Sequence, residues 1–410
     1  MHTLARWIGR LLVALLFGIV LWHPTPAGAD SNPACTTDSR QSPLVIIDSA
    51  PCGRYGVMVT RRDVINGVEG DVTVQFMLHR PTGWPKALVV LFAGGNGDTG
   101  ITGDPATGQV FTAGQNFLVR SAELFARRGY LTLTIDRPSN GPLPNPLYDL
   151  YRVSAVHAHD IVAVVSRVNW LNLDVFLAGT SRGTLSVVAQ HMLGIGSMLS
   201  TPVTSPAGTS LYIGHPGIPN LQPGFVGAPV QVLFHGQDGC FVTTPANSVT
   251  LHTQFLLAGV DSQLEMLLGG FDLTGTDGID ACDALTFHGF LGIENAAVRR
   301  ITNRMDHILA RNHPRFPRNH RPRAHAIVLT TPVASPVSVD LSRLAADLDH
   351  DRLAFSLPYA TSTRGAPITL TGSVATYRPT QAGITDGFVY VVSDGKRGVS
   401  AAVVTVRVLP

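Results

Sequence analysis

Short hydrophobic runs alternate with longer amphipathic stretches over most of the chain. Fully apolar runs such as residues 87–93, ALVVLFA, predict strands that are buried on both faces, and the stretches between them have a helical period. This alternation favours the α/β class, with a mostly parallel sheet and helices on both faces. The expected strands are residues 87–93, 130–136, 175–178, 211–216, 231–238 and 262–268, and the expected helices are residues 116–128, 150–170, 246–258 and 291–309.

The pattern changes at both ends of this region. Residues 54–80 hold two alternating β-type runs around Asn66-Gly67, which predicts an antiparallel edge to the sheet. Residues 311–325 contain five arginines, three prolines and no acidic residue, which is typical of a solvated linker, although a contact with an anionic surface is an alternative. Residues 326–410 show short alternating runs separated by turn residues, and these predict a small β-sandwich.

The first residues have the pattern of an export signal. Arg6 and Arg10 accompany the apolar run LLVALLFGIVLW, and Ala27-Gly28-Ala29 supplies a small-residue cleavage site. A membrane anchor is the alternative, but a membrane-spanning helix needs about 20 apolar residues, and this run is shorter. We therefore expect a signal peptide over residues 1–29, a catalytic domain over 30–310, the linker over 311–325 and the sandwich over 326–410. The mature protein is expected to be secreted, periplasmic or at the cell surface, with no integral membrane segment.

Composition narrows the partners and the redox state. Charged residues make up 14% of the chain and the formal net charge is +2, which argues against a nucleic-acid partner. Four cysteines in an exported chain predict two disulfides, and we favour Cys35 with Cys52 and Cys240 with Cys282 among the three possible pairings. The cysteines lack CxxC spacing, so no zinc site is expected.

A candidate nucleophile lies between a predicted strand and a predicted helix. Residues 175–190, VFLAGTSRGTLSVVAQ, contain Ser181 between two glycines, each two positions away. Such a strand, sharp turn and helix expose the middle side chain, and glycines at these positions prevent a clash between the two elements. A tight-turn serine without chemistry is the alternative.

A serine hydroxyl needs a base, and a histidine base needs a group that orients it. In a sheet of this kind the acid and the histidine follow later strands, in that order. Asp238 lies at the carboxyl end of the strand that includes residues 230–234, and His288 precedes the last helix, so we predict a triad of Ser181, Asp238 and His288. The Cys240–Cys282 bridge would hold the two loops together. Other candidates for the carboxylate are Asp261, Asp272, Asp280 and Asp283.

The glycine-rich loop after residues 87–93 predicts an oxyanion hole. A tetrahedral intermediate needs hydrogen-bond donors at its oxygen. We expect one donor to be the backbone N–H of Arg182 and the second to be that of Gly95 or Asn96. The loop lacks the lysine and the spacing of a phosphate-binding loop.

Residues 55–310 resemble the α/β-hydrolase superfamily through LFAGGNG, AGTSRG, HGQDGC and FHGF. The resemblance implies a serine hydrolase that works through an acyl-enzyme, most often on carboxylic esters. Ala93 stands where many members have histidine. The Arg182 side chain either favours a substrate with an anionic end or points outward.

The last residues resemble bacterial cadherin-like or immunoglobulin-like repeats through DLDHD, YRP and TDGFVY. Asp347, Asp349 and Asp351 supply the oxygen ligands that calcium takes, although His350 replaces the usual small residue. No other cofactor is expected.

We therefore expect an exported carboxylic ester hydrolase, acting on a small-molecule or polymeric ester, with the sandwich as a contact to a polymer or cell surface. A serine peptidase or amidase is one alternative, because the same triad serves both reactions. A non-catalytic surface or adhesion protein on a hydrolase scaffold is the other.

Overall fold

The structure is a computed structural model, and it describes residues 44–49, 53–65, 68–104, 109–112, 114–140, 149–192, 202–204, 229–312, 319–396 and 398–410. The chain divides into two units, residues 1–33 and residues 34–410, and the first unit lies outside the described residues. The expected signal peptide, the expected Cys35–Cys52 bridge and the expected strand at residues 211–216 also lie outside them.

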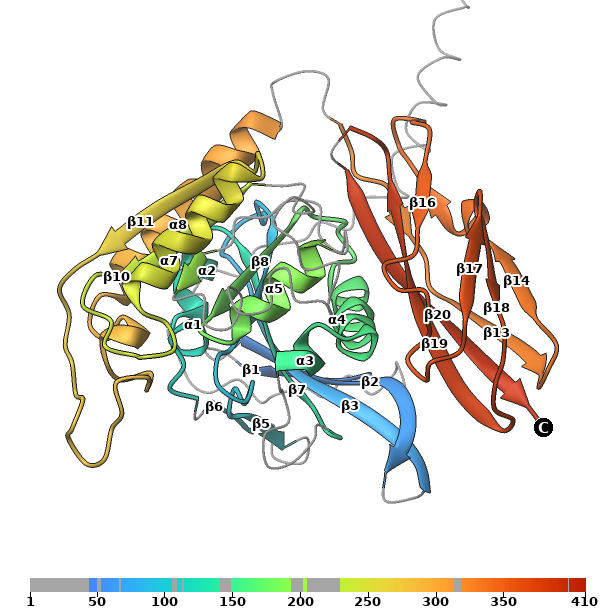
Figure 1. Cartoon of the computed structure of the whole chain (residues 1–410), viewed down its shortest axis with the longest axis horizontal. Coiled ribbons are helices and arrows are strands. Elements are labelled where there is room, and N and C mark those ends of the chain that lie inside the picture. The colour runs from blue at the N-terminus through green and yellow to red at the C-terminus, as the bar shows by residue number, and fades with distance from the viewer. Residues whose placement is uncertain are drawn as a thin grey trace, which may run out of the picture. The chain divides into compact units, whose positions relative to one another are not determined.

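A nine-stranded sheet forms the centre of the first part of the chain, in the order β1-β2-β3-β7-β4-β8-β9-β10-β11 (Figure 1). The pairs from β7 to β11 are parallel, whereas β1, β2, β3 and β7 pair antiparallel with one another in turn. The predicted α/β class is confirmed, but the sheet is mixed. The strands are β1 (Leu44–Ser49), β2 (Gly53–Ile65), β3 (Val68–His79), β4 (Leu88–Phe92), β7 (Leu131–Pro138), β8 (Val175–Thr180), β9 (Pro202–Thr204), β10 (Val230–His235) and β11 (Ser262–Leu267), and β5 (Ile101–Asp104) pairs separately with β6 (Gln109–Thr112).

Two predicted helices are each divided in the structure. The helix expected over residues 116–128 breaks at Ser121, and the one expected over residues 150–170 breaks before Ser154, whose side chain caps a new helix by accepting the His157 N–H at 3.2 Å. The helices that cover the sheet are α1 (Phe117–Arg120), α2 (Ala122–Arg127), α3 (Asp149–Arg152), α4 (Ala155–Val168), α5 (Gly183–Met192), α7 (Pro245–Leu257) and α8 (Glu294–Asn312).

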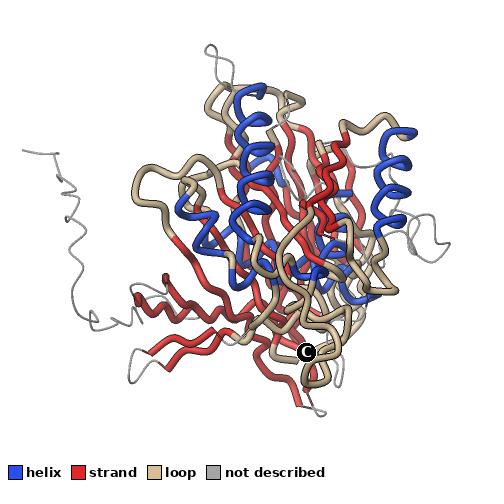
Figure 2. Tube along the Cα trace, turned by 90° about the vertical axis from the view of Figure 1, so that its left-hand side faces the viewer, coloured by secondary structure: helices blue, strands red, loops and turns tan. Residues whose placement is uncertain are grey.

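Alternate residues of the central strand β4 enter two separate hydrophobic clusters. Val90 packs in one cluster with Ile161 of α4 and Phe255 of α7, and the neighbouring Leu91 packs in the other with Ile301 of α8. Successive side chains of a strand point to opposite faces, so the apolar run at residues 87–93 is buried on both sides as its sequence predicts. Figure 2 shows the helices on either side of these strands.

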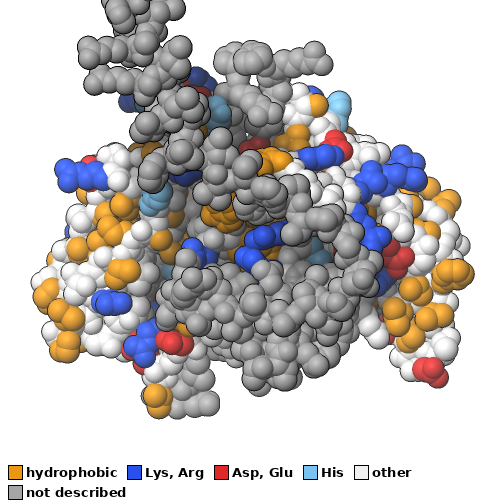
Figure 3. Space-filling view, turned by 180° about the vertical axis from the view of Figure 1, so that it is seen from behind, with side chains coloured by type: hydrophobic (Ala, Val, Ile, Leu, Met, Phe, Trp, Pro, Cys, Tyr) orange, Lys and Arg blue, Asp and Glu red, His pale blue; other side chains and the backbone are white. Residues whose placement is uncertain are grey.

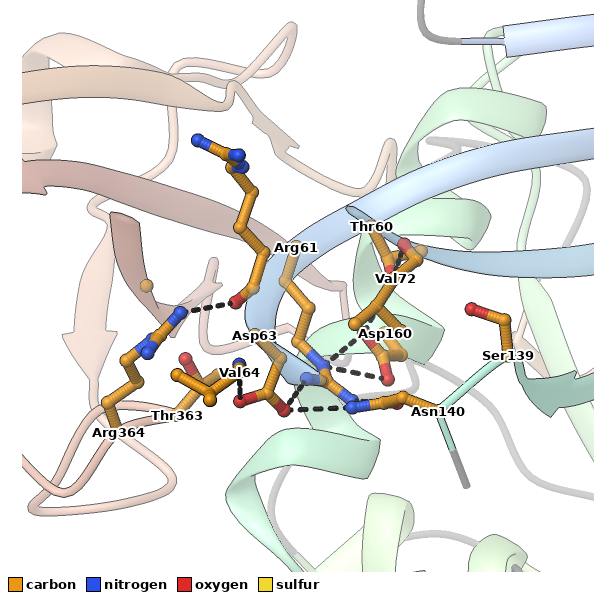
Figure 4. A network of polar contacts seen from close by, with 12 residues as sticks. Thr60, Arg61, Asp63, Val64, Val72, Ser139, Asn140, Asp160, Thr363 and Arg364 are labelled. Atoms are coloured by element: carbon orange, nitrogen blue, oxygen red, sulfur yellow. Dashed lines mark hydrogen bonds and ion pairs between the residues drawn. The ribbon is translucent and has the colours of Figure 1, made fainter. Parts of the chain in front are cut away.

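A polar network anchors α4 to the edge of the sheet (Figure 4). The register of β2 against β3 shifts between Val59 and Arg61, which is a β-bulge. As a result two consecutive side chains reach one carboxylate: Thr60 Oγ1 donates to Asp160 Oδ1 at 2.6 Å, and Arg61 Nε donates to the same oxygen at 3.1 Å. Arg61 also pairs with Asp63. The positive charge of Arg61 therefore balances the negative charge of the buried Asp160 carboxylate, which is also hydrogen-bonded.

Two sheets with a shared core make up the C-terminal part. Their buried side chains include Tyr377 from one sheet and Phe388, Val404 and Val406 from the other. The predicted β-rich architecture is therefore present. The sheets are β13 (Ile327–Pro332), β20 (Val399–Leu409), β19 (Ile384–Ser393) and β16 (Ala354–Ser356), and β14 (Val337–Asp340), β18 (Val374–Tyr377) and β17 (Ile368–Thr371), with β12 (Arg323–Ala324) pairing separately with β15 (Ala345–Ala346).

Two further features are the charge on one face of the molecule and the hydrophobicity of its helices. On the face in Figure 3, basic and acidic side chains are interspersed with hydrophobic ones. Among the described residues, no helix is long and apolar enough to span a bilayer.

Candidate active site

Ser181 lies in a sharp turn between β8 and α5. It has φ +50°, the left-handed region that a non-glycine residue rarely adopts. The flanking glycines are required by close approaches: a Cβ on Gly183 would lie 2.2 Å from the Phe92 carbonyl oxygen, and one on Gly179 would lie 2.5 Å from the Gly183 carbonyl oxygen. The turn therefore has the geometry that the sequence predicts for an exposed nucleophile.

The glycine-rich loop after β4 lies against this turn. A Cβ added to Gly94 would come within 2.8 Å of the Ser181 Cβ. The Gly97 N–H donates to the Gly94 carbonyl at 2.9 Å, and Gly95 has φ +54°. The loop is a tight turn that only a residue without a side chain can bring so close to Ser181.

Asp238 and His288 form a buried pair. His288 Nδ1 lies 3.0 Å from Asp238 Oδ2, and the two side chains are 6% and 0% exposed. The Cys240 N–H donates to the other carboxylate oxygen at 2.9 Å. A histidine that donates from Nδ1 carries its lone pair on Nε2, which is the nitrogen that a general base uses.

The other candidate acids have different partners in the structure. Asp261 accepts from Arg304 at 2.8 Å and from Arg311 at 2.6 Å, at the amino end of β11. The remaining three accept hydrogen bonds from residues of their own exposed loop, namely Asp272 from Thr274, Asp280 from Cys282, and Asp283 from the Asp280 N–H.

Thr243 is a further member of this cluster that the sequence analysis did not predict. Its hydroxyl lies 3.2 Å from Asp238 Oδ2 and 3.0 Å from His288 Nδ1, and the residue is fully buried. A threonine just before a helix N-cap is common in sequences, so its position next to Thr244 gives no functional signal.

The predicted Cys240–Cys282 disulfide is confirmed, with the two Cα atoms 4.4 Å apart. Cys240 is two residues from Asp238, and Cys282 lies in the loop that leads to His288. The bridge therefore connects the segment that carries the acid to the segment that carries the histidine.

Helix α1 links the histidine loop to the glycine-rich loop. Asn116 caps α1 at its start, and its amide nitrogen lies 3.4 Å from the position of a Cβ on Gly94. Arg120, at the end of α1, donates to the Gly289 carbonyl and to Glu294 at 3.0 Å. Helix α1 therefore lies beside the glycine-rich loop at its start and contacts the loop of His288 through Arg120 at its end.

A polar cavity of about 330 Å³ lies at the carboxyl end of β7. Burial raises the pKa of Asp136 in its wall to about 6, although its carboxylate accepts the Thr99 N–H at 3.1 Å. Asp98, from the glycine-rich loop, lines the same cavity. Its other lining residues include Thr73, Gln75, Thr102 and Ser139.

The three aspartates of the predicted calcium site also lie together. One ligand atom from each of Asp347, Asp349 and Asp351 falls within 4.8 Å of the others. However, Lys396 Nζ lies 2.6 Å from Asp351 Oδ1, and His320 Nδ1 lies 2.8 Å from Asp349 Oδ1. The oxygens suit calcium by type, but a lysine already supplies positive charge there. Calcium binding stays a prediction.

These features define a chain in two parts: an α/β-hydrolase-like part with a serine at its elbow, and an immunoglobulin-like β-sandwich. For the second part, residues 319–407 match the model of the bacterial Ig domain family. The comparison with curated proteins gives no match.

The chain is also similar, over part of its length, to solved serine hydrolases and esterases at low identity. An alpha-beta serine hydrolase homologue from Coxiella burnetii is 18% identical with a TM-score of 0.37, over 56% of this chain and 91% of that one. A propionate-bound thermophilic esterase from Thermogutta terrifontis is 16% identical with a TM-score of 0.38, over 65% and 97%. Esterase 2 of that organism, phosphoramylated by tabun, is 15% identical with a TM-score of 0.40, over 65% and 97%.

Proposed function

We propose that the chain is an exported serine hydrolase that cleaves carboxylic esters through an acyl-enzyme. The observation that carries the proposal is the buried His288–Asp238 pair, whose His288 lies on a loop that Arg120 of α1 contacts, while Asn116 at the start of α1 lies beside the glycine-rich loop near Ser181. A strained elbow, an oriented imidazole and a glycine loop are the three parts that this chemistry requires.

In the proposed reaction, Ser181 Oγ attacks the ester carbonyl carbon while His288 Nε2 takes the hydroxyl proton. Asp238 holds the Nδ1 proton and stabilises the imidazolium. The carbonyl oxygen becomes an oxyanion that the Arg182 N–H and an N–H of Gly95 or Asn96 stabilise. Collapse of this intermediate breaks the bond to the leaving alcohol, which receives the proton from His288. Water then attacks the acyl-enzyme by the same steps and releases the acid.

A fluorophosphonate probe tests whether Ser181 is a nucleophile. We expect the probe to label the folded wild-type protein and Ser335→Ala, an exposed serine variant in the sandwich, but not Ser181→Ala. His288→Ala is expected to slow labelling by about 10³-fold or more, because triad members act as a unit. A folded wild-type protein that does not react would favour the non-catalytic alternative.

A substrate panel separates an esterase from a peptidase or amidase. We expect p-nitrophenyl acetate and butyrate to be hydrolysed and peptide anilides to be poor substrates. A higher kcat/KM on the anilides would favour the amidase alternative, since both reactions use the same triad.

A water-insoluble ester is the finer proposal, and a group of exposed hydrophobic side chains supports it. Phe241 follows the acid segment and is 81% exposed, and Phe271, in the loop after β11, is 66% exposed. Leu268 and Met266 are also exposed. Exposed apolar groups near a site favour contact with an apolar surface. Phe241→Ser with Phe271→Ser is expected to reduce activity on an emulsified ester more than on soluble p-nitrophenyl acetate.

Export is supported by the disulfide, which requires an oxidising compartment to form and persist. Fractionation of cells that express the full chain tests this: the protein is expected outside the cytoplasm and shortened at its N-terminus. Full-length protein in the cytoplasm would contradict the proposal.

A further inference from the structure

Arg152, at the end of α3, is fully buried, and it is the largest fully buried side chain among the described residues. A buried cation is costly unless hydrogen bonds surround it. Its Nη2 donates to the Ala93 carbonyl at 3.2 Å and to the Gly95 carbonyl at 3.1 Å, and its Nη1 donates to Ser186 Oγ at 3.0 Å. The side chain therefore binds two backbone carbonyls of the glycine-rich loop.

These contacts control the direction of the loop's N–H groups. A peptide unit is planar and trans, so its N–H points opposite to its C=O. The carbonyls of Ala93 and Gly95 are held by Arg152, and the Gly94 carbonyl between them is held by the Gly97 N–H at 2.9 Å. Three successive peptide planes are thus fixed, and Arg152 fixes two of them, including the plane that carries the Asn96 N–H.

We propose that Arg152 is the positioning residue of the oxyanion hole, and that it orients the Asn96 N–H as the second donor. This inference rests on the proposed function. It decides between the two donors that the sequence left open, because the peptide of the Asn96 N–H is the one whose carbonyl the guanidinium holds. A cation at that carbonyl also polarises the peptide and strengthens its N–H as a donor.

A hydrogen-bonded chain fixes Arg152 itself. Ser186, on the helix that follows the nucleophile, accepts from Arg152 and lies 3.0 Å from His157 Nε2. Burial and the nearby Arg152 lower the pKa of His157 to about 3, so His157 is neutral and its Nε2 accepts a hydrogen bond from the Ser186 hydroxyl. The guanidinium therefore ties the glycine-rich loop to α5, the same helix that begins beside Ser181.

The neighbouring residue extends this support to the sheet edge. Tyr151 donates from its hydroxyl to Asp160 Oδ2 at 3.3 Å. Asp160 is the carboxylate that Thr60 and Arg61 of the β2 bulge hold (Figure 4). Helix α3 is thus held by two sets of contacts: Tyr151 bonds to the network of Figure 4, and Arg152 bonds to the glycine-rich loop.

The test compares Arg152→Met and Arg152→Lys with Arg304→Met in the full chain. Arg304 is a matched control, because its side chain is 10% exposed and pairs with Asp261 at the opposite, amino edge of the sheet. The readouts are kcat and KM for p-nitrophenyl butyrate, the Ki of a trifluoromethyl ketone, and Tm. The ketone forms a tetrahedral adduct whose oxyanion needs the same donors as the transition state.

We expect Arg152→Met to lower kcat by about 10- to 100-fold, less than the 10²- to 10³-fold loss of a whole donor, with KM changed by less than about threefold. The Ki of the ketone should rise by the factor by which kcat/KM falls. Arg152→Lys should lie between Met and wild type, because an ammonium reaches one carbonyl but has no fork to hold two. Arg304→Met should lower Tm and leave kcat and Ki unchanged.

Two results would overturn the inference. One is an Arg152→Met protein whose Tm is lowered while its kcat and the Ki of the ketone are unchanged, because Arg152 would then have only a structural role. The other is a rise in KM with kcat unchanged, which makes it a substrate-binding group. If Arg152→Met does not fold, Ser186→Ala, which removes the anchor of the guanidinium, gives the same discrimination. A wild-type protein that neither labels at Ser181 nor hydrolyses the ester refutes the proposed function instead.

Discussion

Removal of the Cys240–Cys282 disulfide tests how the acid and histidine segments are held. The bridge joins residues 42 positions apart, and for a loop of that length the chain-entropy relation gives a stabilisation of about 4 kcal/mol at 25 °C. The replacement Cys240→Ala with Cys282→Ala leaves the Cys240 backbone N–H in place, so its 2.9 Å bond to Asp238 Oδ1 is kept. The variant therefore removes the cross-link and spares the hydrogen bond.

Urea unfolding measures the effect, with the m-value as a check on two-state behaviour. We expect the double variant to lose about 2–4 kcal/mol of unfolding free energy, which is the typical stabilisation by one disulfide. Activity should also decline at lower urea concentration than global unfolding, because residues 271–278 near Cys282 are all exposed and have little burial to hold them. Wild-type protein reduced with dithiothreitol is the matched control and should behave alike.

A loss below about 1 kcal/mol would refute this reasoning, because it would show that the loop is equally restricted without the bridge. Equal loss of activity and of global structure along the urea titration would refute the second part, in which the bridge acts locally on the histidine segment.

Three further predictions concern single side chains. Thr243→Val should lower kcat/KM for p-nitrophenyl butyrate by about tenfold through loss of one hydrogen bond to Asp238, and an unchanged value would exclude that role. The pKa of Asp136 is raised from 3.8 to about 6, so the folded state binds the proton more tightly than the unfolded state does. The stability of the wild-type protein therefore falls as pH rises between these two values. Asp136→Asn should remove this dependence of Tm on pH and should be more stable than the wild-type protein at about pH 8. The pKa of His157 is lowered from 6.5 to about 3, so stability is lost as pH falls through this range, and His157→Asn should flatten the acid limb of Tm against pH.

The elements whose structure depends on local sequence were predicted well. The strand at residues 87–93, the elbow at Ser181 and the helix at residues 246–258 each follow from a local pattern of apolar residues, glycines or caps. The strand that pairs between β8 and β10 was not predicted: it is β9, Pro202–Thr204, whose three residues are too few to show a period.

The residues of the candidate site that are distant in sequence also fall into two sets, those that were predicted and those that were missed. His288 and Asp238 were predicted because each follows a strand or precedes a helix at the same edge of the sheet. Thr243 and Arg152 were missed, since neither belongs to a motif and each acquires its role from partners that are distant in sequence, such as the Ala93 carbonyl for Arg152. Sequence patterns identify residues that act through position in an element, and they do not identify residues that support others.

The sandwich packs against α4. Ala158 and Val162, on the outer face of that helix, pack with Val389 and Val391 of β19, and Tyr359 donates to the Val153 carbonyl at 3.0 Å. Val153 is the residue next to Arg152, so the contact from the sandwich reaches the segment whose Arg152 binds the glycine-rich loop. Residues 34–410 accordingly form one unit. These contacts predict that the sandwich stabilises α4 and the segment before it, in addition to any contact with a surface.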